Sequence, residues 1–133
     1  MTADVLDRPQ ETPFDQIGGA AVVRRVVDRF YDLMDGEGEF APLRALHAPE
    51  LDPMRASLAG FLTAWLGGPR DWFEQRPGVC MMSAHAAVPV TRETAAQWIG
   101  AMSRALADEG VEARLRDPMI AALSRMAQVM ALR

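Results

Sequence analysis

The apolar residues of this chain recur every three to four positions, and this period constrains the fold more than any other feature of the sequence. After Gly18-Gly19, the segment 22–34 places apolar residues on one side of a helix and charged residues such as Arg24 and Asp28 on the other. This arrangement predicts an amphipathic helix that buries one face. Because its β-branched valines are mediocre helix formers in isolation, we expect packing against other segments to stabilise it.

Two further segments combine the same period with residues that begin or end helices. Asp52-Pro53 supplies a candidate N-terminal cap and a first-turn proline, and the helix that follows should end at residues 67–69, two glycines and a proline. Thr91 is expected to cap another helix, which should end near Gly110.

The last helix is expected to open at Asp117-Pro118, and its buried face carries mostly methionine, isoleucine and leucine. No segment shows the alternation of apolar and polar residues that is typical of a strand. The sequence therefore predicts an all-α protein with four main helices and short extra turns.

The connecting segments are less regular. Residues 40–47 are expected to form one or two helical turns, and residues 81–87 a brief helix. Residues 69–80 look like a long connecting loop. Because Trp72 and Phe73 within that loop are large and apolar, we expect them to pack on something, and a binding site could lie beneath them.

The length and charge of the chain limit its organisation and its partners. With 133 residues, half of them hydrophobic, it is long enough for one domain with a sizeable core. We expect residues 1–12 to form a flexible N-terminal tail and residues 13–133 to form the domain. The formal charge of -4 gives no basic surface for a phosphate backbone, which argues against nucleic acid as a partner.

The sequence also indicates a cellular compartment. The single cysteine, Cys80, cannot form an internal disulfide, and residues 1–9 carry charges where a signal peptide needs an apolar stretch. No apolar run approaches the roughly 18 to 20 residues that cross a bilayer. We therefore expect a soluble protein of the reducing cytoplasm, without a membrane partner.

Few residues point to a chemical activity. The sequence contains no phosphate-binding loop, no Cys-x-x-Cys or His-x-x-x-His metal pair and no evident nucleophile. Of its two histidines, His85 stands among apolar neighbours on a short predicted helix. Such a histidine is either a core residue bonded to a backbone carbonyl or a metal ligand, and the pattern alone leaves both interpretations open.

Several short motifs, in their order along the chain, resemble the truncated haemoglobins, group II in particular. The motifs are Phe14-Asp-Gln-Ile-Gly-Gly19, Asp28-Arg-Phe-Tyr31, Leu43-Arg-Ala-Leu-His47, Phe61-Leu62 with Gly67-Gly-Pro-Arg70, Glu74-Gln-Arg76, His85-Ala86, and Gln97-Trp98 with Met102. The resemblance extends from about Phe14 to the C-terminus. It implies a truncated globin fold, a two-over-two helical sandwich around a haem pocket, with haem b (iron protoporphyrin IX) as the cofactor.

The resemblance also implies roles for individual residues. His85 would be the metal ligand, bound to iron through Nε2 on the proximal side. Tyr31, Trp98 and His47 would stand on the distal side, where all three side chains can donate a hydrogen bond. Because buried donors are stronger than the same donors in water, oxygen release should be slow.

Further cofactor contacts follow from the same resemblance. They are Leu58, Phe61 and Leu62 in an apolar wall, Met54 near the path of gas access, and Trp72 and Met82 beside the porphyrin. Two departures from group II proteins stand close to His85. Met82, Ser83 and Ala84 occupy the positions where arginines usually pair with the haem propionates, and Val88 replaces an aromatic residue. The candidate substitutes for the arginines are Arg70, Arg76 and the Trp72 indole.

We therefore predict a haem-binding truncated globin that reversibly binds dioxygen at a five-coordinate iron, with other diatomic gases as further candidate ligands. The first alternative is a haem redox enzyme, either a peroxidase or a nitric oxide dioxygenase, served by an unidentified reductase. The second alternative is a haem-free helical module that binds an apolar ligand or a protein partner, which the missing arginines favour. The sequence is compatible with a monomer or a homodimer.

Overall fold

The helices expected from the sequence form the fold. The computed structural model describes residues 11–78, 85 and 88–131, and every regular element within these ranges is a helix. The elements are α2 (Pro13–Ile17), α3 (Ala20–Gly36), η1 (Gly38–Phe40), α4 (Ala41–Arg44), α5 (Asp52–Trp65), α6 (Asp71–Glu74), α8 (Arg92–Asp108) and α9 (Ala113–Ala131). The predicted all-α class is confirmed. No helix in the described ranges is long and apolar enough to span a membrane.

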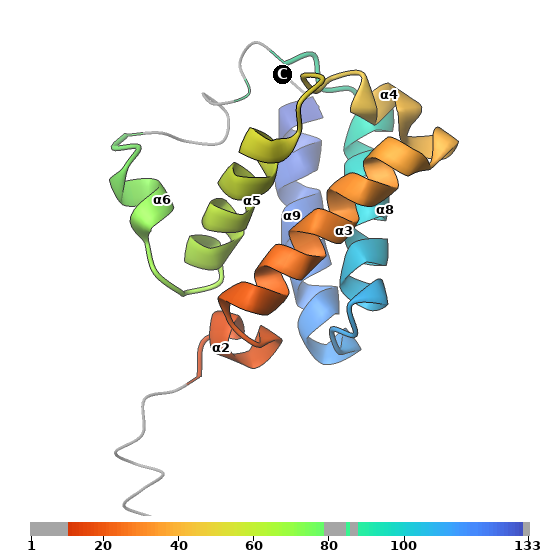
Figure 1. Cartoon of the computed structure of the whole chain (residues 1–133). Coiled ribbons are helices and arrows are strands. Elements are labelled where there is room, and N and C mark those ends of the chain that lie inside the picture. Colours follow the sequence, from red (N-terminus) through yellow and green to blue (C-terminus); the bar gives the residue numbers. More distant parts are fainter. Residues whose placement is uncertain (1–10, 79–84, 86–87, 132–133) are drawn as a thin grey trace, which may run out of the picture.

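The four long helices form two pairs that cross one another (Figure 1). α3 packs on α5, α8 packs on α9, and α3 also crosses α8. Only residues 109–112 separate α8 from α9, so these two helices run antiparallel. This is the two-over-two sandwich that the sequence predicted.

α3 supplies the centre of the core. Its predicted apolar face is buried, and Val23, Val26, Val27, Phe30 and Tyr31 are each 2% exposed or less. Full burial of an aliphatic or aromatic side chain contributes about 1.5 to 3 kcal/mol relative to exposure. Packing on α5 and α8 therefore outweighs the low helix propensity of the valines.

Several helix ends also agree with the prediction. Gly67 follows α5 with a φ of +98°, and Gly110 follows α8 with a φ of +81°. At both ends the amides that follow the helix donate back to carbonyls of its last turn, an arrangement that needs the left-handed conformation glycine adopts without strain. Thr91 caps α8, because its hydroxyl oxygen accepts a hydrogen bond from the Thr94 amide at 3.1 Å.

Two helix starts differ from the prediction. Asp52 does not cap α5, since Leu51 holds the cap position and Asp52 is the first helical residue, where its charge favours the helix N-terminus. α9 begins at Ala113, so Pro118 lies inside the helix rather than at its start. Two amides of the first turn donate to the Glu112 carbonyl, and the helix is therefore already formed when it reaches the proline.

The expected loop over residues 69–80 contains the short helix α6. Its Trp72 is 9% exposed and packs edge-on against Phe61 of α5, with ring centroids 5.4 Å apart. The prediction missed α6 because the residue that stabilises it lies on another helix.

Some predicted features lie outside the described residues. They are residues 1–10 of the expected tail, Met82, and most of the helix expected at 81–87. Of that helix, His85 is described, and it lies in a turn. Thr12, at the end of the expected tail, caps α2, because its hydroxyl oxygen accepts a hydrogen bond from the Asp15 amide at 3.1 Å.

Candidate functional site

A cavity of about 430 Å³ lies between the helix pairs, with walls from α3, α4, α5, α6, α8 and α9 and from the segments that follow α4 and precede α8. This volume is within the range of about 300 to 1,000 Å³ that is usual for small-molecule and cofactor sites. Most of the predicted cofactor contacts line it, namely Tyr31, His47, Met54, Leu58, Phe61, Trp72, His85 and Trp98. The structure therefore brings together residues that are more than 60 positions apart in the sequence.

Leu62 is the described exception. It is 2% exposed and belongs to the core, but it does not line the cavity. It lies one helical turn beyond Leu58, in the last turn of α5. Its expected haem contact stays a prediction. Met82 is outside the described residues.

Other lining residues were not singled out as site residues. They include Leu43, Leu46, Ser57, Val88, Val90, Thr94, Ala95, Leu123, Met126, Ala127 and Met130. The helical period does identify the buried face of α9, but burial in a core and exposure to a cavity give the same pattern.

A wider groove of about 500 Å³ lies between α8 and α9. It shares Ala95 and Ala127 with the cavity. Its lining contains alanines, Ile99 and three polar residues, Arg92, Ser124 and Gln128, but no histidine, tyrosine or tryptophan, so the chemically more diverse cavity is the better candidate site.

Tyr31 presents its phenol to the cavity from α3. Its ring meets Phe30 edge-on at 4.9 Å and the His47 imidazole edge-on at 6.0 Å, measured between centroids. Its hydroxyl forms no hydrogen bond with any part of the chain that the structure describes. Burial raises the pKa of Tyr31 to about 12, although the nearby Arg55 charge opposes the rise. At neutral pH the phenol is therefore a protonated donor that has no acceptor among these residues.

Trp98 presents an indole to the same cavity from α8. It is half-buried, and its ring packs edge-on against Phe30 with centroids 5.1 Å apart. Phe30 thus contacts both the Tyr31 and the Trp98 ring and limits the movement of each. Within the described ranges the indole N–H also has no hydrogen-bond acceptor.

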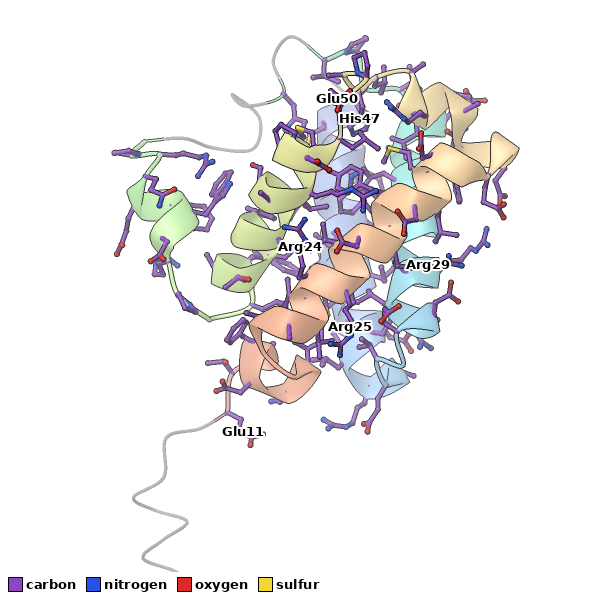
Figure 2. All side chains as sticks on the ribbon, viewed as in Figure 1. Glu11, Arg24, Arg25, Arg29, His47 and Glu50 are labelled. Carbon is purple, nitrogen blue, oxygen red and sulfur yellow. The ribbon has the colours of Figure 1, made fainter. Side chains whose placement is uncertain are left out.

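His47 differs from these two donors. It stands after α4, in the connection to α5 at one end of the molecule (Figure 2). Its Nδ1 donates to the Leu43 carbonyl at 3.0 Å, because a carbonyl can only accept. Burial lowers its pKa, the hydrogen bond to the Leu43 carbonyl opposes this effect, and the positive charges of Arg44 and His85 add to it. Neutral His47 therefore carries a lone pair on Nε2, so the expectation that it donates to a ligand does not hold for this tautomer.

His85 lines the cavity in the turn before α8. Its backbone carbonyl accepts a hydrogen bond from the Val88 amide at 3.0 Å. Because its charge influences the pKa of His47, the two imidazoles are within electrostatic reach of one another.

The three candidate propionate anchors are placed differently. The Trp72 indole already donates to the Ser57 hydroxyl oxygen at 3.1 Å. The Arg76 guanidinium lies 4.5 Å from the Trp72 ring centroid and donates to the Trp72 carbonyl, while Arg70 lies over Phe73. Neither arginine forms an ion pair with a described residue, so both remain available to an anion.

The residues of the cavity fit a haem group. A porphyrin is a large apolar ring, and leucine, valine, methionine and aromatic side chains make up most of the walls. His85 adds an imidazole, which is the usual axial ligand of haem iron in globins. Fold and pocket together define a globin of the truncated, two-over-two class.

Comparisons with known proteins agree with this class. A sequence model for the family described as bacterial-like globin matches residues 12–132, and the chain belongs to this family. It is 26% identical to the group 2 truncated hemoglobin YjbI of Bacillus subtilis over 118 residues, which are 89% of this chain and 86% of the relative. The predicted resemblance to group II truncated haemoglobins is confirmed.

Solved structures show the same relationship. A group II 2-on-2 hemoglobin of Agrobacterium tumefaciens has a TM-score of 0.88 and 31% identity, with 93% of this chain and 96% of that chain covered. A truncated haemoglobin of Bacillus subtilis described as oxygen-avid has a TM-score of 0.80 and 26% identity, with 90% of this chain and 98% of that chain covered. Membership of the family implies haem as the cofactor and a diatomic gas as its ligand.

Proposed function

We propose that this protein binds haem b in the cavity, with His85 as the proximal ligand, and that it binds dioxygen reversibly. The main support is the pair of donors without acceptors, the Tyr31 hydroxyl and the Trp98 indole N–H, on the cavity walls. Both groups face the cavity and donate to no described residue, so each is available as a donor to a polar ligand there. The oxygen-avid relative is consistent with dioxygen as that ligand.

Haem supplies the iron at which a diatomic ligand coordinates. The side chains around the iron stabilise the bound ligand. Tyr31 and Trp98 donate to a ligand that carries partial negative charge, and neither has to give up a hydrogen bond to another described residue. Phe30 holds both rings, so the donors lose little freedom when the ligand arrives.

The apolar walls have a separate task. Leu58 and Phe61 exclude water from the ligand, and Met54 is 40% exposed although it lines the cavity. Because the Met54 side chain contacts both the cavity and the solvent, we place it on the path by which gas enters. Neutral His47 adds bulk and an acceptor rather than a third donor. We therefore assign most of the stabilisation of the ligand to Tyr31 and Trp98.

A redox enzyme is the second candidate. Tyr31 and Trp98 are oxidisable, and Phe30 lies in contact with both rings. Such a cluster could supply electrons to a peroxidase, and a nitric oxide dioxygenase would also need a reductase. Turnover of peroxide by the native protein, lost together in Tyr31→Phe and Trp98→Phe, would favour this candidate over an oxygen-binding role.

The direct test of the proposal is an oxygen equilibrium measured on haem-loaded, reduced protein by absorption spectroscopy. We expect spectra that change on addition of oxygen and return when oxygen is removed. Rapid irreversible oxidation of the iron in place of this cycle would contradict reversible binding. Failure of the protein to take up haem would favour the alternative of a haem-free helical module. A cytoplasmic location, a single domain at 13–133 and a monomeric or homodimeric state stay predictions, which fractionation, limited proteolysis and sedimentation can check.

A further inference from the structure

Arg55 joins α5 to α3 beside the distal tyrosine. Its Nη1 donates to the backbone carbonyl and to Oδ1 of Asp28, both at 3.1 Å, and its Nη2 donates to Oδ1 of Asp32 at 2.8 Å. The Arg55 side chain is 17% exposed, the smallest fraction for any arginine that forms an ion pair among the described residues. A single guanidinium therefore fixes the first turns of α5 on the middle of α3.

This contact lies next to Tyr31. Asp28 and Asp32 flank Tyr31 on α3, one turn before it and one residue after it. The guanidinium carbon of Arg55 is 5.7 Å from the centroid of the Tyr31 ring, within the range of a cation–π interaction. On α5, the neighbour Met54 lines the cavity that Tyr31 faces.

We propose that Arg55 is a positioning residue for Tyr31, which holds the phenol ring against α3 and strengthens its hydroxyl as a donor toward the cavity. The proposal rests on the proposed function, in which Tyr31 donates to the ligand. A positive charge beside the ring withdraws electron density from the phenol, and this makes the O–H more acidic and a better donor. The same charge lowers the pKa of Tyr31 against the larger effect of burial.

The geometry allows Arg55 to be removed without unfolding the protein. Asp28 and Asp32 have side chains that are 39% and 59% exposed, so water can solvate both carboxylates when the arginine is absent. Asp28 also keeps its ion pair with Arg24. Arg55→Met retains most of the side-chain volume and removes the charge and the hydrogen bonds, so this substitution isolates the interaction.

The chain contains one tyrosine, which gives a site-specific probe. Fluorotyrosine incorporated at this position reports on Tyr31 alone by fluorine NMR, with or without haem. In Arg55→Met we expect a shifted and broadened fluorine resonance and a higher phenol pKa. Arg55→Lys keeps the charge but not the planar fork, so it should restore part of the pKa change and less of the ring order.

Arg104→Met is the matched control. Arg104 also binds two carboxylates, those of Glu37 and Glu39, and lies 5.9 Å from the ring centroid of Phe40, but none of these residues lines the cavity. The fluorine resonance should not respond to this substitution. An unchanged resonance in Arg55→Met, or an equal change in Arg104→Met, would overturn the proposal.

Oxygen dissociation from the haem-loaded protein completes the test. Arg55→Met should raise the dissociation rate about two- to fivefold, the size expected for loss of one cation–π interaction. In a Tyr31→Phe background the same substitution should have no further effect, and an equal effect there would show that Arg55 does not act through Tyr31. If Tyr31→Phe leaves the rate unchanged while Arg55→Met shifts the fluorine resonance, the donor role fails and the positioning role stands.

Discussion

Tyr31→Phe should separate ligand binding from stability more sharply than any other substitution in the cavity. The phenol ring is 2% exposed and packed between Phe30 and His47, and phenylalanine keeps all of these ring contacts. Only the hydroxyl is lost, and it has no acceptor among the described residues. The substitution should therefore leave the free energy of unfolding nearly unchanged, because it removes no hydrogen bond to a described residue.

The effect on the ligand should be large. A hydrogen bond to a charged or partly charged acceptor contributes about 1.5 to 3 kcal/mol when the donor is buried. Since about 1.4 kcal/mol corresponds to a factor of ten, the oxygen dissociation rate should rise about 10- to 100-fold. The association rate should change much less, because the path of gas access is unaltered.

Stopped-flow measurement of oxygen dissociation and urea denaturation of the same samples provide the assay. Phe30→Leu is a useful control, because it disturbs the packing of both donors without removing either hydrogen-bonding group. It should lower stability by about 1 kcal/mol or more. A Tyr31→Phe protein that is destabilised by several kcal/mol, with an unchanged dissociation rate, would show that the hydroxyl has a structural partner and no role at the ligand.

Three further predictions follow from the geometry. Trp98→Phe removes the second donor and should raise the oxygen dissociation rate about tenfold by stopped flow, whereas an unchanged rate would leave Tyr31 as the only donor. His47 has a folded-state pKa below its ordinary 6.5, so the unfolded chain takes up the proton first, and the free energy of unfolding should fall as the pH drops below about 6.5. The change of the free energy of unfolding with pH, measured by urea denaturation, should be smaller in His47→Phe. An identical pH dependence in this variant would show that other groups cause it. Gly68→Ala would place a Cβ 2.8 Å from the Phe14 ring, so the melting temperature should fall by several degrees. An unchanged melting temperature would mean that the Phe14 ring of α2 can move aside without loss of stability.

Local sequence signals were sufficient for the long helices. The apolar stripe of α3, the cap at Thr91 and the glycines at positions 67 and 110 act within one or two turns of the chain, so their consequences can be derived without tertiary structure. The short helix α6 could not be derived in this way, because Trp72 is held by Phe61 on α5. Pro118 misled the prediction for α9, since proline marks a helix start more often than a helix interior.

The site shows the same division between local and tertiary information. The motif order predicted most of the residues that line the cavity. Leu58 and Leu62 lie only one helical turn apart on α5, and which of them lines the cavity depends on how α5 packs against α3. The tautomer of His47 depends on the Leu43 carbonyl. Arg55 gave no signal at all, because its partners Asp28 and Asp32 lie on another helix.

Resonance Raman spectroscopy of the reduced, ligand-free protein observes the proposed bond between the His85 imidazole and haem iron directly. We expect an iron–imidazole stretching band in the native protein, its loss in His85→Gly, and its return when free imidazole is added to that variant. The same band persisting unchanged in His85→Gly would show that another side chain holds the iron and that His85 is not the proximal ligand.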